Sequence, residues 1–100
     1  MVINVLDYVR YCYSHTDGQI IFNLIFPAIK RGEMVTVSFK GVNAVPSSFV
    51  NAAFINLLEY YTFETIRDKL KFASSTKQIN EMIKRRFDFE VNHRKKMVAV

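Results

Sequence analysis

Two adjacent serines, Ser47 and Ser48, are the side chains best placed to carry chemistry. They follow an apolar segment and a turn containing Gly41 and Pro46, and they precede a long amphipathic segment. A strand that leads into a serine-capped helix places hydroxyls and backbone N–H groups at one exposed point. We favour a capping role, in which Ser48 accepts a hydrogen bond from a helical N–H. The alternatives are a phosphoacceptor, because a helix N-terminus stabilises added negative charge, and an anion site formed by the same N–H groups.

Basic side chains in the last third of the chain form a second candidate site. Four basic residues stand against five acidic ones before Arg67, but ten stand against four from Arg67 onward. A solvated helix face and a solubilising tail are the simplest interpretation. The alternative is contact with nucleic acid or another acidic partner, although base stacking needs exposed aromatic rings among the charges. The residues concerned are Lys77, Lys84, Arg85, Arg86, Arg94, Lys95 and Lys96.

Cys12 and His15 could form a nucleophile and base pair if the chain bends between them, with Asp17 as the nearest carboxylate to orient the imidazole. Cys12 lies between two tyrosines in an apolar segment, so a small core residue is the better interpretation. A single cysteine and two distant histidines lack the paired spacing of a zinc site, and the three glycines are isolated. We therefore expect no catalytic activity, no metal and no cofactor.

The composition predicts one folded domain. Half of the 100 residues are apolar, which excludes the disordered class, and this length suits a single core. The apolar run from Ile20 to Ile29 is about half as long as a bilayer span. The chain does not open with a secretion signal, and its lone cysteine fits a reducing compartment. We expect no membrane association and a cytoplasmic location.

The first half of the chain predicts two strand regions around a helix. β-branched and aromatic residues favour a strand or strand pair over residues 2–13. Thr16 is the expected cap of a helix with an apolar face, and Phe22 and Phe26 widen that face. These two rings either complete the core of a sheet covered on both faces or form an exposed patch that mediates dimerisation or partner binding. The alternation over residues 34–39 predicts a short buried strand.

The second half predicts helices on either side of one more strand. Apolar residues recur at helical spacing from Val50 to Tyr61, which indicates an amphipathic helix beginning at Ser47 or Ser48. Thr62 can cap a short helix ending near Lys69, and residues 70–73 predict a strand. The spacing of Ser75 and Gln78 indicates a capping box for a last helix, with periodicity lost after residue 88. Strands separated by helices of this length form right-handed crossovers, so the fold class is α/β with a small, largely parallel sheet and packed helices.

The order of these elements resembles a known family. A capped helix, a strand ending in Phe39-Lys40-Gly41-Val42, then Pro46-Ser47-Ser48-Phe49 and an Ala/Leu-rich helix are similar to the STAS-like domains of unknown function, relatives of anti-sigma-factor antagonists. The resemblance covers residues 16–87. It implies a STAS-like fold and a protein that acts by binding. In the antagonists, a kinase of the ATPase fold phosphorylates one serine of an Asp-Ser-Ser-Gly turn, and the unmodified form binds the partner. Ser47 and Ser48 match those serines, whereas Pro46 and Phe49 replace the flanking aspartate and glycine.

We therefore expect a single STAS-like domain over residues 1–89, with residues 90–100 as a basic tail or a terminal strand. Its expected function is non-catalytic, regulatory protein binding in the cytoplasm of a bacterium or phage host. The predicted partner surface comprises Val45, Ser47, Ser48 and Phe49, and the predicted partner is a kinase of the ATPase fold or another regulator. The alternative is a nucleic-acid-associated or phage-type inhibitory protein that uses Lys84, Arg85, Arg86, Arg94, Lys95 and Lys96.

Overall fold

The computed structural model describes the backbone of residues 1–98 and the side chains of residues 1–94. None of the helices in this part of the chain is both long enough and apolar enough to cross a bilayer. In chain order the elements are β1 (Val2–Asn4), the 3-10 helix η1 (Val5–Asp7), α1 (His15–Lys30), β2 (Val35–Ser38), α2 (Ser47–Ala53), the 3-10 helix η2 (Ile55–Glu59), α3 (Phe63–Lys69), β3 (Leu70–Ala73) and α4 (Lys77–Val98).

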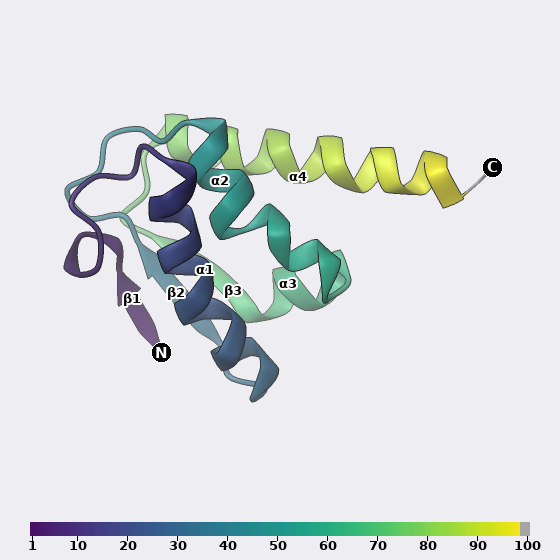
Figure 1. Ribbon diagram of the computed structural model, residues 1–100, viewed down its shortest axis with the longest axis horizontal. Coiled ribbons are helices and arrows are strands. Elements are labelled where there is room, and N and C mark those ends of the chain that lie inside the picture. The colour runs from purple at the N-terminus through teal and green to yellow at the C-terminus, as the bar shows by residue number, and fades with distance from the viewer. Residues whose placement is uncertain (99–100) are drawn as a thin grey trace.

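The three strands form one parallel sheet in the order β1-β2-β3 (Figure 1). In the register, Ile3 stands opposite Val37, and Val37 stands opposite Phe72. Helices connect the successive strands, as parallel pairing requires. The prediction of an α/β fold with a small, largely parallel sheet is confirmed.

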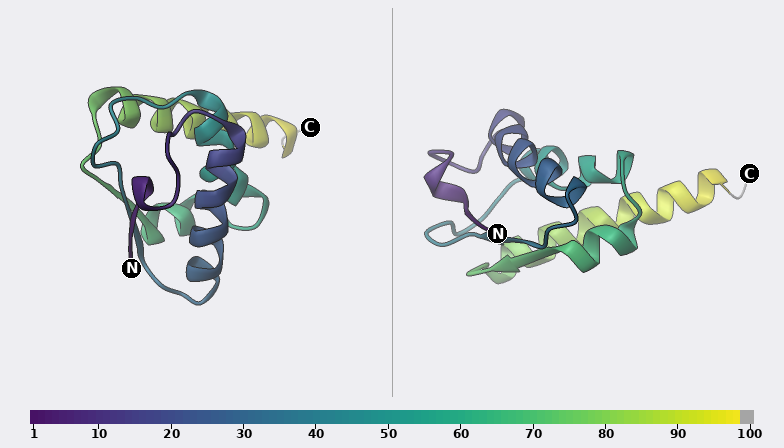
Figure 2. Two further views of the ribbon diagram at one scale, coloured as in Figure 1. Left: turned by 60° about the vertical axis from the view of Figure 1, so that its left-hand side comes forward. Right: turned by 90° about the horizontal axis from the view of Figure 1, so that it is seen from below.

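The helices cover mainly one face of this sheet. Ile3, Val35 and Val37 are fully buried on the covered face, over which α1 and α2 lie side by side (Figures 1 and 2). On the opposite face, Val2 and Lys71 are exposed. The expectation of a sheet covered on both faces is therefore wrong for these strands. A two-layer arrangement suffices because alternate residues of a strand point to opposite faces, so only one set needs apolar cover.

Phenylalanine rings join β2, α2 and β3 at the centre of the core. Phe39 lies with its ring centroid 6.5 Å from that of Phe49 and 6.2 Å from that of Phe54. The Phe54 ring in turn meets Phe72 edge-on at 5.1 Å. Edge-on contacts of this kind are favourable beyond the area they bury. This cluster fixes α2 against the ends of β2 and β3.

The beginning of the chain contains much less strand than expected. Only Val2–Asn4 pair with β2, and a 3-10 turn and an irregular loop follow as far as Ser14. The prediction of a strand or strand pair over residues 2–13 is therefore wrong beyond Asn4. Because β2 is only four residues long, it offers no backbone partner for a longer strand.

The cap of α1 is Ser14 and not Thr16. The Ser14 hydroxyl accepts a hydrogen bond from the N–H of Asp17 at 3.1 Å, whereas Thr16 lies inside the helix. In this helix Gly18 faces α2 closely, since a Cβ built on Gly18 would lie 2.6 Å from the Phe49 carbonyl oxygen. This missing side chain allows α1 and α2 to pack backbone against backbone.

The long helix expected from Ser47 to Tyr61 is divided in two. Phe54 has φ −121° and ψ −47°, which ends α2, and η2 continues the segment. The short helix α3 and its cap agree with the prediction, because the Thr62 hydroxyl accepts from the Thr65 N–H at 3.2 Å.

The last helix is longer than expected and begins with a different cap. Thr76, not Ser75, accepts a hydrogen bond from the Ile79 N–H at 3.3 Å. The helix then continues to Val98, so residues 90–98 are neither a frayed tail nor a strand; residues 99 and 100 lie outside the described residues. Ion pairs one turn apart, such as Lys84 with Asp88 and Arg86 with Glu90, stabilise the helix where its apolar periodicity stops. Its C-terminal part extends beyond the rest of the domain (Figure 1).

Candidate functional site

Ser47 and Ser48 are both exposed at the first two positions of α2. Neither caps the helix, because Pro46 occupies the cap position and no side chain accepts a hydrogen bond there. The Ser48 hydroxyl instead donates to the carbonyl oxygen of Tyr13 at 3.3 Å. The prediction that a serine caps this helix is therefore wrong. The two hydroxyls lie at the surface and one of them ties α2 to the loop before α1.

Val45 and Phe49, the other two residues of the predicted partner surface, belong to the core. Val45 is 2% exposed and Phe49 is fully buried. Neither side chain can contact a partner in this fold, so that part of the prediction requires correction. Apolar residues that flank a polar turn at this spacing fit the core equally well, and the sequence pattern alone does not separate the two roles.

Two exposed tyrosines lie in the loop that the Ser48 hydroxyl contacts. The rings of Tyr11 and Tyr13 are stacked, with centroids 5.1 Å apart and planes 5° apart. They are 54% and 66% exposed, respectively. We name the surface formed by Tyr11, Tyr13, Ser47 and Ser48 the tyrosine–serine surface; the hydrogen bond from Ser48 to Tyr13 joins its two halves.

A hollow of about 370 Å³ adjoins the tyrosine–serine surface. The loop before α1 lines one side of it and residues 41–44 line the other. Its walls are both polar and apolar. Sequence reasoning missed this region because it assigned the tyrosines to a strand. Three tyrosines within six positions, Tyr8, Tyr11 and Tyr13, were the available signal, since tyrosine is enriched at binding surfaces.

A known protein family matches most of this chain. Residues 17–80 match the family described as "STAS-like domain of unknown function (DUF4325)". The match covers more than half of the chain. The chain belongs to this family. No curated protein and no solved structure matched the chain.

The matched segment of this STAS-like domain runs from the first turn of α1 to the first turn of α4. It includes both serines and the core cluster of phenylalanines. Tyr11 and Tyr13 lie before it, and the extended part of α4 lies after it. Half of the tyrosine–serine surface therefore comes from residues that precede the matched segment.

Acidic partners pair with much of the basic surface of the STAS-like domain. Lys84 lies 2.9 Å from Asp88, Arg86 lies 2.9 Å from Glu90, and Arg94 lies 2.7 Å from Glu59. Arg86 also donates to the Asn51 amide oxygen at 2.8 Å. Lys77 makes a longer contact of 3.9 Å with Glu81, and Arg85 is exposed. The side chains of Lys95 and Lys96 lie outside the described residues.

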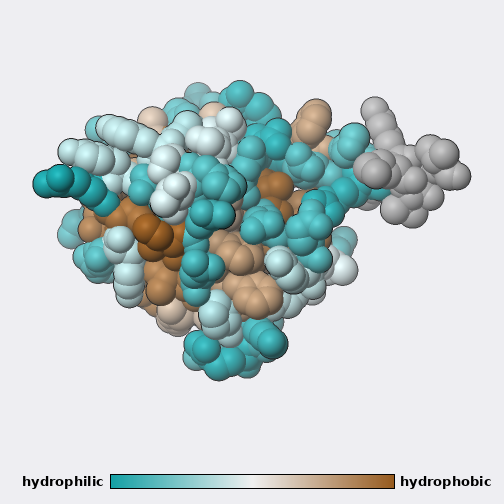
Figure 3. Space-filling view, in the orientation of Figure 1, coloured by the Kyte–Doolittle hydropathy of each residue, from teal (hydrophilic) through white to brown (hydrophobic). Residues whose placement is uncertain are grey.

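These ion pairs give the basic side chains of α4 structural roles. Arg86 and Arg94 fasten the helix to α2 and η2, across a polar groove between these elements and the start of α1. Figure 3 shows that the extended part of the helix, up to the grey region, has a mostly hydrophilic surface. Because the pairs neutralise these cations locally, few of the basic side chains in the described part of α4 are left unpaired to contact an acidic partner.

The thiol of Cys12 is held inside the fold. Cys12 is 2% exposed, and burial, assisted by the negative charge of Asp17, raises the pKa of its thiol to about 11. The prediction that Cys12 is a small core residue is confirmed. A thiol with this pKa is protonated at neutral pH, which disfavours the alternative of a nucleophile paired with His15. Among the described residues, no three His, Cys, Asp or Glu side chains lie close enough to hold a metal ion.

Phe22 and Phe26 are half-buried on the outer side of α1. Their rings are stacked at 5.5 Å, and Phe26 meets the ring of Tyr60 at 4.8 Å and that of Tyr61 at 5.8 Å. These contacts join α1 to the end of η2 within one chain. A dimer through the two rings stays a prediction.

Proposed function

We propose that this STAS-like domain is a non-catalytic regulatory module that binds another protein through its tyrosine–serine surface. The observation that carries the proposal is the exposed, stacked pair of Tyr11 and Tyr13 in the loop to which the exposed Ser48 is hydrogen-bonded. Tyrosine rings supply a large contact area at little conformational cost and are enriched among residues that dominate binding energies. Stacking holds the rings in place before any partner arrives, which lowers the entropy lost on binding.

Modification of Ser48 offers a switch for this surface. Its hydroxyl donates to the Tyr13 carbonyl, whereas a phosphate carries about two negative charges and lacks the proton for that hydrogen bond at neutral pH. The added charge would repel the carbonyl oxygen and separate the loop from α2. Phosphorylation by a kinase of the ATPase fold would then release the partner, as the family resemblance implies. The cytoplasm is the compartment we propose for this interaction.

A pull-down from the native host tests the proposal. Wild type is compared with Tyr11→Ala/Tyr13→Ala, Ser47→Asp/Ser48→Asp and Ser47→Ala/Ser48→Ala, and circular dichroism confirms that each variant is folded. We expect one protein to be retained by wild type and the alanine serine variant, but lost by the tyrosine and aspartate variants.

Arg85→Glu/Arg86→Glu tests the alternative function, which is nucleic-acid binding through the basic residues of α4. If it alone loses the captured material, and that material contains nucleic acid, the tyrosine–serine proposal fails and the basic surface is the working site. Binding through that surface would also weaken steeply with salt, because ions are released when phosphates are neutralised.

A further inference from the structure

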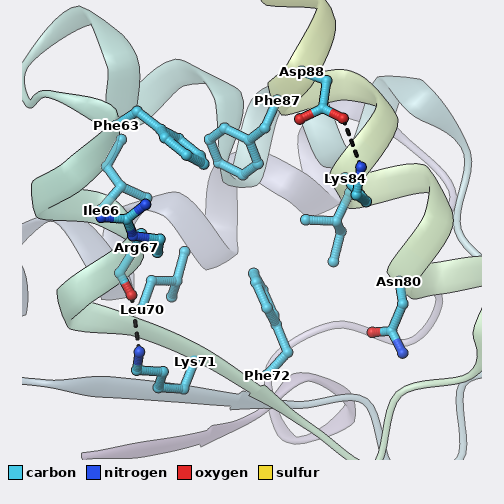
Figure 4. A pocket seen from close by; sticks show the side chains of 11 residues that line it. Phe63, Ile66, Arg67, Leu70, Lys71, Phe72, Asn80, Lys84, Phe87 and Asp88 are labelled. Carbon is cyan, nitrogen blue, oxygen red and sulfur yellow. Dashed lines mark hydrogen bonds and ion pairs between the residues drawn. The ribbon is translucent and has the colours of Figure 1, made fainter. Parts of the chain in front are cut away.

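An apolar pocket opens between α3, β3 and α4 and shares no lining residue with the tyrosine–serine surface. Its volume is about 420 Å³, within the range of small-molecule sites. Figure 4 shows that side chains from all three elements converge on it. The apolar lining consists of Phe63, Ile66, Leu70, Phe72, Ile83 and Phe87.

The walls of this pocket are held in place by the core. Phe63 and Phe87 meet across one end, with ring centroids 5.5 Å apart. Phe72 rises into the pocket from β3, and its ring also packs against Phe54 at 5.1 Å (Figure 4). Ile66 and Leu70 are buried at the base. A ligand would therefore enter a preformed cavity and would not need to separate packed side chains.

Positive charge gathers at the rim. Three cationic residues, Arg67, Lys71 and Lys84, line the pocket with a single acid, Asp88. Lys84 is paired with Asp88 at 2.9 Å on the α4 side. Lys71 donates from Nζ to the Arg67 carbonyl oxygen at 3.0 Å, so its ammonium lies near the end of α3.

Arg67 and Lys71 leave this side of the rim with uncompensated charge. The Arg67 guanidinium lies 5.9 Å from the centre of the Phe63 ring. Within the described part of the chain, neither Arg67 nor Lys71 is in an ion pair. Arg67 and Lys71 are therefore available to an anion at the rim, next to the apolar lining.

We propose that this pocket binds a small carboxylate that carries an apolar chain. The chain would lie among Phe63, Phe72 and Phe87, and the carboxylate would lie at Arg67 and Lys71. A small molecule fits better than an extended protein segment because side chains of three elements converge on the apolar part, which has the volume of a small-molecule site. This site is independent of the tyrosine–serine surface.

Octanoate, 1-octanol and acetate separate the contributions of chain and charge. Each is titrated into labelled full-length protein while methyl NMR signals of Ile66, Leu70 and Ile83 are followed. We expect octanoate to shift these signals and to bind about tenfold more tightly than 1-octanol, because one charge-assisted hydrogen bond is worth that factor. Acetate should leave the signals unchanged, since it lacks the apolar chain.

Paired charge reversals test the rim. Arg67→Glu/Lys71→Glu should abolish the preference for octanoate, while 1-octanol still binds. Lys40→Glu/Lys77→Glu changes the net charge equally at exposed positions outside the pocket and should preserve the preference.

Three results would overturn the proposal. They are equal affinities for octanoate and 1-octanol in wild type, the same loss in both charge-reversed variants, and no octanoate binding in wild type. In the last case, signals that shift with protein concentration alone would assign the pocket to a second copy of the chain, and signals that shift only with an acidic, leucine-rich peptide would assign it to a protein partner.

Discussion

The side chain of Gln78 forms two hydrogen bonds with the backbone of Val45. The Val45 N–H donates to Oε1 at 3.0 Å, and Nε2 donates to the Val45 carbonyl oxygen at 3.1 Å. The amide thus pairs with the Val45 backbone as a neighbouring strand would. It joins the first turn of α4 to the loop before α2. This contact explains why Gln78 does not reach back to Ser75 as a capping box would require.

We expect Gln78→Ala to lower the free energy of unfolding by about 1–3 kcal/mol, because both backbone groups of Val45 lose their partner. Urea unfolding measures the change. Gln19→Ala removes an exposed glutamine from α1 and should stay within about 0.5 kcal/mol of wild type. A loss of unfolding free energy for Gln78→Ala that is as small as the loss for Gln19→Ala would show that the Val45 contact contributes nothing.

Gly18→Ala should destabilise the domain by about 1–3 kcal/mol, although alanine normally stabilises a helix interior. The new methyl group would lie 2.6 Å from the Phe49 carbonyl oxygen and 2.7 Å from the Ala52 Cβ, so α1 and α2 must separate. Thermal unfolding gives the direction of the change. Asn23→Ala, at an exposed position of the same helix, is the control and should stabilise; a raised melting temperature for Gly18→Ala would refute the close packing.

Ser14→Ala should cost about 1 kcal/mol of stability because it removes the cap of α1. Thr16→Ala should cost much less, since the Thr16 side chain is exposed inside the helix. Parallel urea denaturation of the two variants compares the costs. The opposite ranking would restore Thr16 as the cap.

The Cys12 thiol should react slowly with a disulfide reagent at pH 8 in the folded protein and rapidly in urea. Burial raises its pKa from 9.0 to about 11, so the folded state retains the proton that the unfolded state loses. The stability that depends on the protonated thiol is therefore complete below pH 9 and declines as the pH rises from 9 to 11. Subtracting the pH profile of Cys12→Ala from that of wild type isolates this decline, and a flat difference would contradict it.

Phe22→Ser/Phe26→Ser should reduce stability by about 2–5 kcal/mol, because the two rings pack against Tyr60 and Tyr61 in the same chain. Unfolding curves and sedimentation velocity are measured together. Ile20→Ser, at a position of α1 that is 40% exposed, is the control. A variant that keeps wild-type stability but changes from dimer to monomer would identify the rings as an interface.

The sequence predicted which side chains are buried more accurately than it predicted where each helix is continuous. The alternation around Val35 and Val37 identified the central strand, because only one arrangement of a short strand buries that set. The stripe containing Val50, Ala53 and Leu57 is buried as predicted, yet the helix breaks at Phe54. Periodicity reports which side chains face the core, and it does not report a local change from α to 3-10 geometry.

The candidate site could not be predicted in full because distant contacts decide it. Ser48 has its hydrogen-bond partner 35 positions earlier in the chain, and Gln78 has its partner 33 positions earlier. Each residue fits a local capping pattern that these tertiary contacts override. The position of the serines was predicted from the strand and helix around them. The exposure of Tyr11 and Tyr13 could not be predicted without knowing that the pairing of β1 ends at Asn4.

The parallel sheet has a consequence for how the chain folds. The partners Ile3 and Val37 are about a third of the chain apart, and so are Val37 and Phe72. No hairpin joins any two of these strands, so each pairing must await the closure of a long loop and the entropy that this closure costs. Refolding should consequently be slow for a chain of this size, with β1 free to join last because it contributes only three residues at one edge.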